Sequence, residues 1–414
     1  MSYAYLSLLA IGLAVFLGFW RDLNVGILSL AFAFPLGVLG AGLTPSEIIS
    51  FWPTKLFVTL IGVSLLFSIA RCNQTLERIA AKSIALARGN GPLIPWIFFL
   101  LAAIFAAIGP GNIAVVAILS PIAMTIAADL KISPILMAAM LIGGSNAGGM
   151  SPIAPTGIIG INLAQQYLNV DTALSTWLAM IISAFLYCLL LYFIYGGYRL
   201  EKKNFKEMPN LEKFNRNNKM TLAAMIFLII AVAFLQWDLG FSAFLAASTL
   251  LLFKAGQEKE SIAQIPWSAL ILVAGTGTLI EVTAKLGGID LLTMFFKNLM
   301  TEKTATSLLG LISGIMTFFA SASGVVMPTL IRTLPSLLSE FDFLSAPIMV
   351  AAIVAGGHLV TTGPFTTLGA LALAALNPAH DRAKFMRAQL LTSLLGMAFT
   401  FVLFFFLFKL PFLS

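Results

Sequence analysis

Four short interruptions in a strongly apolar chain carry the residue types that could do chemistry. Each contains glycine together with proline, serine, asparagine, threonine or histidine, and none contains Lys, Arg, Asp or Glu. The interruptions are Gly109–Asn112, Gly143–Pro152, Ser321–Gly324 and Gly356–Pro364. Inside a bilayer, backbone leaves the helical conformation only where it is buried in protein or lines a cavity. We therefore expect the four interruptions to form a binding site.

The chemistry of such a site follows from the ends of interrupted helices. Each interruption exposes free N–H groups with partial positive charge at one helix end and free carbonyls at the other. The positive ends suit an anion, and the carbonyls suit a small cation when amide and hydroxyl oxygens lie nearby. The candidate substrate-binding residues are Gly111, Asn112, Ser145, Asn146, Ser321, Ser323, Gly324, His358, Thr361, Thr362 and Pro364. The candidate cation-binding residues are Gly109, Asn112, Asn146, Gly148 and Ser323.

These side chains also have structural interpretations. We interpret Asn112 and Asn146 as ligands, although the same residues can cap helices or join two spans by hydrogen bonds. Serines and threonines in membrane helices often bond to their own backbone. His358 is the one histidine in an interruption, and both a proton or substrate role and a packing role are open. No cofactor or bound metal is expected beyond a coupling Na⁺.

The elements that position the interruptions are predicted to be membrane spans. The chain is 59% hydrophobic and 10% charged, whereas soluble domains are about 25% charged. The composition therefore indicates an all-α integral membrane protein. Further spans are predicted near 5–20, 23–43, 55–71, 172–197, 220–236, 240–254, 267–284 and 388–408. The basic residues lie in loops between these runs and form no single face, which excludes nucleic-acid binding.

The two halves of the chain are related in sequence. A constant shift of 213 residues places Pro53 on Pro266 and Gly143-Gly144 on Gly356-Gly357. We infer a duplication in which each half has five crossings, one of them broken, and a re-entrant helical hairpin. The hairpins are expected at about 93–127 and 305–338, and the broken spans at about 134–166 and 346–377.

Charge predicts the orientation of the halves. The segment 198–219 carries seven Lys and Arg residues and is expected to be a cytoplasmic linker between repeats at 1–197 and 220–414. Five crossings is an odd number, so the repeats are inverted. The arrangement places 18 of the 24 Lys and Arg residues inside the cell, Lys82, Arg88 and Lys202 among them, and both termini outside. The expected location is a bacterial cytoplasmic (inner) membrane.

The sequence does not assign a role to two charged residues, Glu281 and Arg332. Glu281 lies four residues before Lys285, a spacing that favours an ion pair within one helix. Arg332 lies one arm into the second hairpin. It either attracts an anion or extends its guanidinium to the membrane surface.

The sequence resembles the ion transporter superfamily, within it the divalent anion/sodium symporters and malonate-type or C4-dicarboxylate carriers. The resemblance covers nearly the whole chain and rests on Pro110-Gly111-Asn112, on Gly143-Gly144-Ser145-Asn146, and on Pro152, Pro155 and Thr156. The first hairpin tip keeps the family's Asn as Gly111-Asn112-Ile113, whereas the second reads Ser323-Gly324-Val325 and lacks it. The resemblance implies an elevator carrier with a mobile unit and a homodimeric scaffold in the lipid. It also implies a cation site around Asn112 and Asn146.

The expected function is secondary active transport of a small organic anion, most simply a C3 or C4 dicarboxylate coupled to Na⁺ or H⁺. No P-loop, nucleophile–base arrangement or metal-ligand cluster is visible in the sequence, which argues against ATP-driven pumping and against an enzyme. The alternatives left open are a carrier of another solute with the same fold, an ion exchanger, and a channel. The solute, symport against exchange, and the ion stoichiometry are not determined by the sequence.

Overall fold

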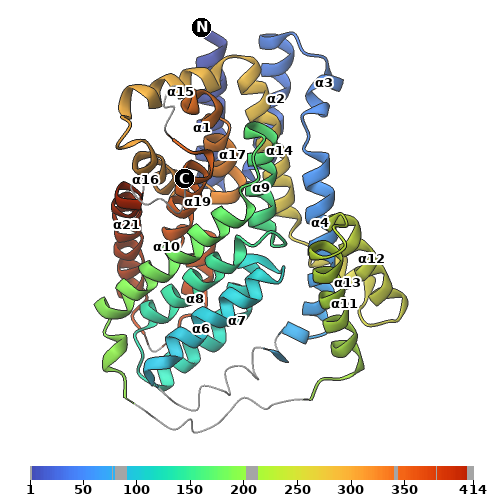
Figure 1. The fold of residues 1–414 in the computed structure, drawn as a ribbon, viewed down its shortest axis with the longest axis vertical. Helices are drawn as coiled ribbons and strands as arrows, with labels where there is room; N and C mark the ends of the chain where they lie inside the picture. Colours follow the sequence, from blue (N-terminus) through green and yellow to red (C-terminus); the bar gives the residue numbers. More distant parts are fainter. Residues whose placement is uncertain are drawn as a thin grey trace.

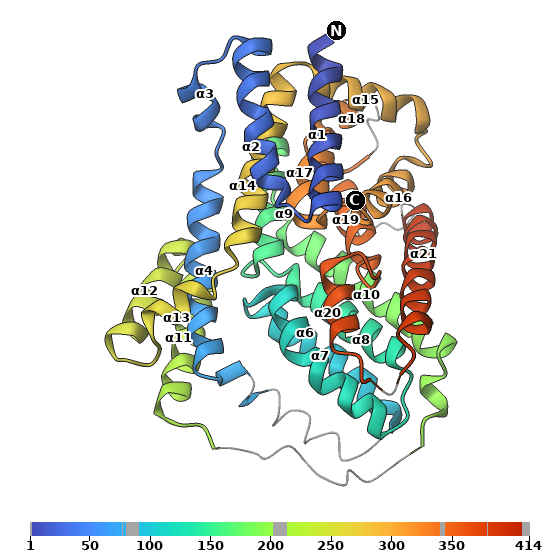
Figure 2. The same cartoon turned by 180° about the vertical axis from the view of Figure 1, so that it is seen from behind.

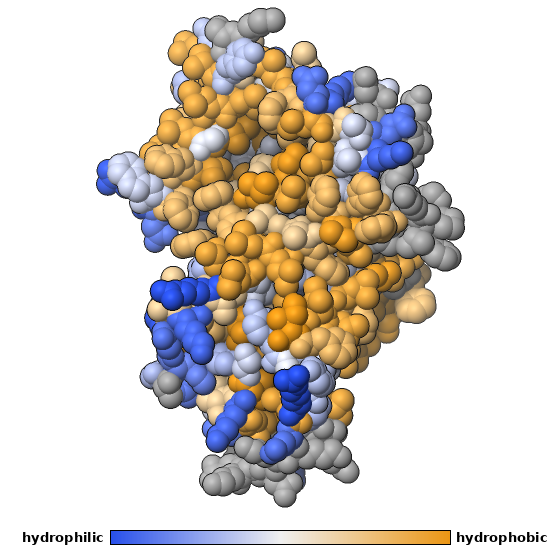
Figure 3. Space-filling model, turned by 90° about the vertical axis from the view of Figure 1, so that its left-hand side faces the viewer, coloured by the Kyte–Doolittle hydropathy of each residue, from blue (hydrophilic) through white to orange (hydrophobic). Residues whose placement is uncertain are grey.

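The computed structural model describes residues 2–76, 78–79, 91–201, 213–339, 344–378 and 380–407. Every regular element in these ranges is a helix. Six of the described helices are long and apolar enough to cross a membrane. Large apolar side chains such as Leu9, Phe16 and Phe241 are exposed on helix surfaces, and Figure 3 shows one face that is largely hydrophobic. The chain is therefore an integral membrane protein. Lys82, Arg88 and Lys202 lie outside the described residues.

One group of helices is built from the N-terminal segment and the middle of the chain (Figures 1 and 2). Its members are α1 (Ser2–Arg21), α2 (Val25–Pro35), a π-helical turn η1 (Leu36–Gly40), α3 (Pro45–Ser50), α4 (Thr54–Cys72), α11 (Arg216–Ala233), α12 (Leu239–Leu252), α13 (Glu258–Ala263), α14 (Trp267–Lys285) and α15 (Gly288–Leu299). We call it the outer group. Within it α4 packs against α12, and α2 packs against α14.

Glycines allow these two crossings to be close. A Cβ on Gly62 of α4 would lie 2.5 Å from the carbonyl oxygen of Gly240 on α12. A Cβ on Gly275 of α14 would lie 2.2 Å from the carbonyl oxygen of Gly26 on α2. Gly62 and Gly275 are related by the shift of 213. Each half of the chain therefore contributes one helix to each crossing.

The second group of helices contains the interruptions, and we call it the inner group. From the first half come α6 (Ile94–Ala107), α7 (Gly111–Asp129), α8 (Pro134–Gly149), α9 (Pro155–Leu168) and α10 (Ala173–Ile194), and short 3₁₀ turns η2 (Gly91–Leu93) and η3 (Gly197–Arg199) lie beside them. From the second half come α16 (Ala305–Thr317), a π-helical turn η4 (Ala322–Val326), α17 (Met327–Ile331), α18 (Leu334–Leu338), α19 (Ala346–Leu359), α20 (Thr367–Ala374) and α21 (Arg382–Leu407).

The helix breaks lie at or within a few residues of the four interruptions. Residues 143–149 and 356–359, which were predicted to be interrupted, are instead helical and form the ends of α8 and α19. α6 and α7 form a helical hairpin around Gly109, and α8 and α9 are separated by a short non-helical segment that begins at Met150. In the second half α16 turns into η4 and α17 around Ser321, and α19 and α20 are separated at Val360–Thr366. The helix α8 is almost wholly buried, so its interrupted end lies inside the protein.

Three short helices outside the predicted spans were not predicted from the sequence: α3, α13 and α15. α15 follows Gly287 and has buried Ile289 and Phe296 on one face, with Met294 and Phe295 exposed on the other. α15 is 12 residues long, shorter than the roughly 20 residues that a membrane span needs.

Candidate functional site

Two asparagines predicted as ligands meet inside the inner group. Asn112 lies in the first turn of α7, and Asn146 lies in the last turn of α8. The Asn112 Nδ2 donates to the Asn146 Oδ1 at 3.0 Å, and both side chains are buried. The Asn112 Oδ1 also accepts from the backbone N–H of Ile113 at 2.9 Å. Two interruptions of the first half are thus joined by a direct amide–amide hydrogen bond.

The same Asn146 extends the connection into the second half. Its Nδ2 donates to the backbone oxygen of His358 at 2.9 Å and to the Thr361 Oγ1 at 2.8 Å. Thr361 in turn donates to the His358 oxygen at 2.7 Å. These groups lie at the C-terminal end of α19, where the helix leaves carbonyls without helical partners. We call Asn112, Asn146, Thr361 and the His358 carbonyl the amide centre.

The amide centre is neutral and closed in this conformation. Asn146 is 1% exposed and His358 is 2% exposed. No group of three or more His, Cys, Asp or Glu side chains that could hold a metal ion occurs among the described residues. Any cation held here would be bound by amide, hydroxyl and carbonyl oxygens, which suit hard cations and leave transition metals without their preferred ligands.

His358 contributes its backbone to the centre and turns its ring elsewhere. The ring Nδ1 lies 2.7 Å from the carbonyl oxygen of Val354, one turn back in α19. A carbonyl only accepts, so Nδ1 is the protonated ring nitrogen. The imidazole is therefore held by a hydrogen bond within its own helix.

Several predicted polar residues bond to nearby backbone or to other side chains in place of the amide centre. The Ser145 hydroxyl donates to the Ile142 oxygen at 2.8 Å within α8. Thr362 faces the Ser393 hydroxyl of α21 at 3.3 Å, and Ser393 donates to the Val360 oxygen at 2.8 Å. Ser393 was missed in the sequence because it lies in an otherwise regular span, with no glycine or proline beside it.

The Ser321–Gly324 interruption is tied to the outer group. Ser321 caps the turn by accepting from the Gly324 N–H at 3.1 Å. The hydroxyl of Thr276, on α14, donates to the Gly324 carbonyl. Ser323 is partly buried, and no recorded hydrogen bond joins it to the amide centre. Thr276 was also missed, although its setting of Gly275-Thr276-Gly277 is a visible signal of close packing.

Two predicted cation-site glycines have steric roles. A Cβ on Gly109, whose φ is +132°, would lie 1.9 Å from the Phe67 ring of α4. A Cβ on Gly148 would lie 1.9 Å from the Ala103 carbonyl oxygen of α6. Gly111 has a φ of +77°, in the left-handed region that glycine adopts without strain. It lets the chain reverse immediately before Asn112. Pro364 and Gly324 are both buried.

Four helices begin at the interruptions. α7 starts at Gly111, η4 after Ser321, α9 at Pro155 and α20 at Thr367. α20 packs against α7, and α9 packs against both η4 and α17. The positive ends of these helices are the electrostatic feature available to an anion, since the interruptions contain no basic side chain.

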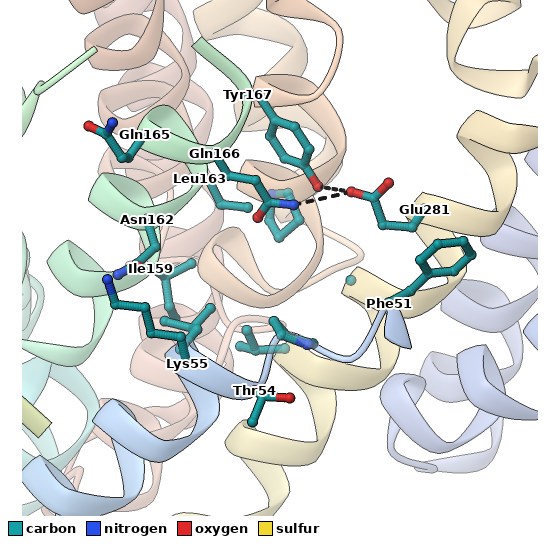
Figure 4. Close-up of a pocket in the computed structure, with 15 residues that line it drawn as sticks. Phe51, Thr54, Lys55, Ile159, Asn162, Leu163, Gln165, Gln166, Tyr167 and Glu281 are labelled. Carbon is teal, nitrogen blue, oxygen red and sulfur yellow. Dashed lines mark hydrogen bonds between the residues drawn. The ribbon is translucent and has the colours of Figure 1, made fainter. Parts of the chain in front are cut away.

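A cavity of about 320 Å³ lies apart from the amide centre, between the two helix groups (Figure 4). Its walls come from the start of α4, from α9, from α14 and from Pro328 of α17. Neither Asn112 nor Asn146 lines it. The sequence did not predict this cavity, because its walls come from four separate elements.

Glu281 lies on the wall of this cavity and corrects one prediction. Its Oε1 accepts from the Tyr167 hydroxyl at 2.5 Å and from the Gln166 Nε2 at 3.3 Å, and the Arg332 Nε lies 3.8 Å away. The Arg332 guanidinium also lies 4.6 Å from the centre of the Tyr167 ring. The recorded ion pair of Glu281 is therefore with Arg332, and the local pair with Lys285 was wrong. Arg332 neutralises a carboxylate of the other helix group.

Residues 1–149 match the family model of the dicarboxylate carrier protein MatC N-terminus. The predicted resemblance to malonate-type dicarboxylate carriers is thereby confirmed for this part of the chain. No curated protein sequence matches the chain.

Two solved structures have the same fold. The YdaH transporter of Alcanivorax borkumensis matches with a TM-score of 0.64 at 13% identity, over 99% of this chain and 98% of that one. MtrF of Neisseria gonorrhoeae, described within a class of antimetabolite efflux pumps, matches with a TM-score of 0.56 at 16% identity, over 89% and 83%. The family model and both structures are of carriers or transporters, so the chain is a membrane transporter and not an enzyme.

Proposed function

We propose that the protein is a secondary active carrier of a small organic anion, a C3 or C4 dicarboxylate, coupled to Na⁺ or to H⁺. The amide centre is the single observation that carries the proposal. It joins interrupted helices from both halves of the chain through buried, uncharged hydrogen bonds. The match of residues 1–149 to a dicarboxylate carrier supports the solute class.

Neutral ligands fit the energetics of a coupled carrier. Moving one net charge against the membrane potential costs about 2.3 kcal/mol per 100 mV. A cation bound by amide and carbonyl oxygens offsets part of the charge of the anion during the crossing. The interruptions contain no Lys or Arg that would add a permanent positive charge. The four helix N-termini bind a carboxylate without that permanent charge.

The packing supports an elevator movement of the inner group against the outer group. Contacts are extensive inside each group, as for α4 with α12 and α6 with α8. Between the groups they are confined mainly to α4 with α9, α14 with η4 and α17, and α15 with α18. The proposal includes inverted repeats, a homodimer formed by the outer group, both termini outside, and an inner-membrane location.

Transport in liposomes tests the function. Purified protein should accumulate labelled malonate, malate or succinate when a Na⁺ or pH gradient is imposed. Collapse of the gradient with an ionophore should abolish accumulation. Uptake of an inorganic anion without any dicarboxylate would contradict the solute, and flux that neither saturates nor responds to a gradient would indicate a channel.

Sodium titration of two variants tests the cation site. Asn112→Ala should weaken activation by Na⁺, because the Asn112 amide lies at the head of α7 beside Asn146. Asn298→Ala is the matched control, since Asn298 is exposed on α15. Equal Na⁺ activation in both variants would show that the amide centre is not the binding site of the coupling Na⁺.

A further inference from the structure

The cavity between the helix groups has a polar lining that the amide centre does not use. Lys55 stands in the first turn of α4 and is exposed. Asn162, Gln165 and Gln166 lie on the facing helix α9. Residues three and four apart share one face of a helix. The three amides therefore form one polar strip along the cavity.

Charge on the cavity wall is unevenly distributed. Glu281 is paired with Arg332 and is hydrogen-bonded by Tyr167 and Gln166. The positive charge that compensates it comes from Arg332, which does not line the cavity. Among the described residues, Lys55 is the one Lys or Arg that lines the cavity. No described acidic residue forms an ion pair with it. The cavity thus carries net positive character at the Lys55 end.

Donors converge at that end. In Figure 4 the nitrogen-bearing ends of the Lys55 and Asn162 side chains point toward one another. Asn162 uses one amide hydrogen on the Ile158 oxygen at 2.8 Å, and an amide has a second hydrogen to donate. An ammonium and an amide N–H directed at the same space suit a carboxylate oxygen.

The cavity also has suitable size and position. About 320 Å³ falls at the lower end of the roughly 300–1,000 Å³ of small-molecule sites. Its lining follows α9 from Ile159 to Tyr167. α9 begins at Pro155, which lies against Gly111 at the head of α7. The cavity is therefore lined by the exposed Lys55 and by a helix whose first residue lies next to the first interruption.

We propose that this cavity is a second anion site, in which Lys55 and Asn162 hold a carboxylate of the solute before it reaches the amide centre. Identification of that anion as a dicarboxylate rests on the proposed function. The site lies between the two helix groups, so it is formed by residues of both.

Cysteine labelling tests occupancy without depending on transport. The chain has two cysteines, buried Cys188 and partly buried Cys72, and Cys72→Ser removes the more accessible one. In that background, malonate should slow the reaction of Thr54→Cys with a charged methanethiosulfonate at least threefold, because Thr54 is exposed and lines the cavity next to Lys55. Lys285→Cys is the control, because Lys285 is exposed near the end of α14 and does not line the cavity. Its labelling rate should not change.

A movement of the helix groups on binding at the amide centre would also change the labelling rate. A double variant distinguishes this movement from direct occupancy of the cavity. Asn112→Ala disables the amide centre, so protection of Thr54→Cys that persists in that variant reports binding in the cavity itself. Protection that disappears with Asn112→Ala would overturn the second site. Absence of protection in the parent variant would overturn it as well.

Transport kinetics provide the second readout. Lys55→Ala should raise the KM for dicarboxylate about tenfold, equivalent to about 1.4 kcal/mol, with little change in kcat. The KM is measured for uptake from the side of the membrane to which the cavity opens. Lys55→Arg should restore most of the affinity, and Lys285→Ala should behave as wild type. An unchanged KM in Lys55→Ala would refute the inference while leaving the proposed function intact. Protection by malonate without any dicarboxylate transport would support the second site and refute the function.

Discussion

Replacement of Asn146 by alanine is the sharpest test of the amide centre. The substitution removes one hydrogen bond from Asn112 at 3.0 Å and two to the second half, at 2.9 and 2.8 Å. Hydrogen bonds between membrane helices contribute about 0.6 kcal/mol each on average. The three together therefore contribute about 2 kcal/mol.

A further cost comes from the partner left behind. The Asn112 Nδ2 is buried and loses its recorded acceptor, which costs about 1–3 kcal/mol. Thr361 keeps its bond to the His358 oxygen at 2.7 Å, so the second half is affected less. We expect Asn146→Ala to destabilise the protein by about 3–5 kcal/mol, because the lost bonds and the stranded donor add.

The measurement is thermal unfolding in detergent alongside transport in liposomes. Asn146→Ala should unfold several degrees below wild type and should need more Na⁺, or a lower pH, for half-maximal uptake. Asn298→Ala, an exposed amide on α15, should leave both values unchanged. If Asn146→Ala has wild-type stability and wild-type ion dependence, the amide centre is neither structural nor functional.

Three other substitutions test the surrounding structure. Gly148→Ala should prevent stable folding or cost at least about 3 kcal/mol, because the added Cβ would lie 1.9 Å from a carbonyl oxygen. The control Gly12→Ala should be tolerated, because nothing lies within 4 Å of a Cβ there. Equal expression and equal melting temperature of the two variants would refute the close crossing. Glu281→Gln should cost about 1 kcal/mol or less, because its pair with Arg332 is partly exposed, and a high-salt buffer should erase the difference. Hydrogen bonds in a capping box lower the pKa of Glu47 below its ordinary 4.5, so the ionised form stabilises the fold above that value and this contribution is lost as pH falls. The melting temperature of Glu47→Gln should therefore depend less on pH below about 5 than that of wild type, and parallel pH profiles would refute the assignment.

Helix positions were predictable because the relevant signals are local. Apolar runs of span length predicted α1, α4, α10, α14 and α21, and glycine with proline predicted where the backbone leaves the helix. Those signals depend on the chain's own hydrogen bonding and on the cost of unpaired backbone in lipid. The short amphipathic α15 has neither the length of a span nor a break, which is why it was not predicted.

The partners of side chains were much less predictable. The spacing of Glu281 and Lys285 gave a plausible pair within one helix, but Tyr167 and Gln166 reach Glu281 from α9 and Arg332 approaches from beyond α17. A local pair on a helix is worth only about 0.2–0.5 kcal/mol. Two hydrogen-bond donors and one guanidinium from neighbouring elements offer a larger stabilisation. Such an outcome depends on which helices pack together, and no local spacing encodes it.

The amide centre shows how a duplicated sequence forms an unequal site. The shift of 213 carries Asn112 to Val325, which has no polar side chain, and the Gly324 carbonyl beside it is bound by Thr276 of the outer group. Asn146 meets the second half at a backbone carbonyl and a hydroxyl. The first half therefore supplies the amide oxygens and the second half supplies carbonyl and hydroxyl oxygens. A cation bound at this junction would contact both halves at once, and its release would require the ends of α8 and α19 to separate. In the proposed carrier, that requirement would couple the binding of a cation by neutral ligands from two repeats to the conformation of the inner group.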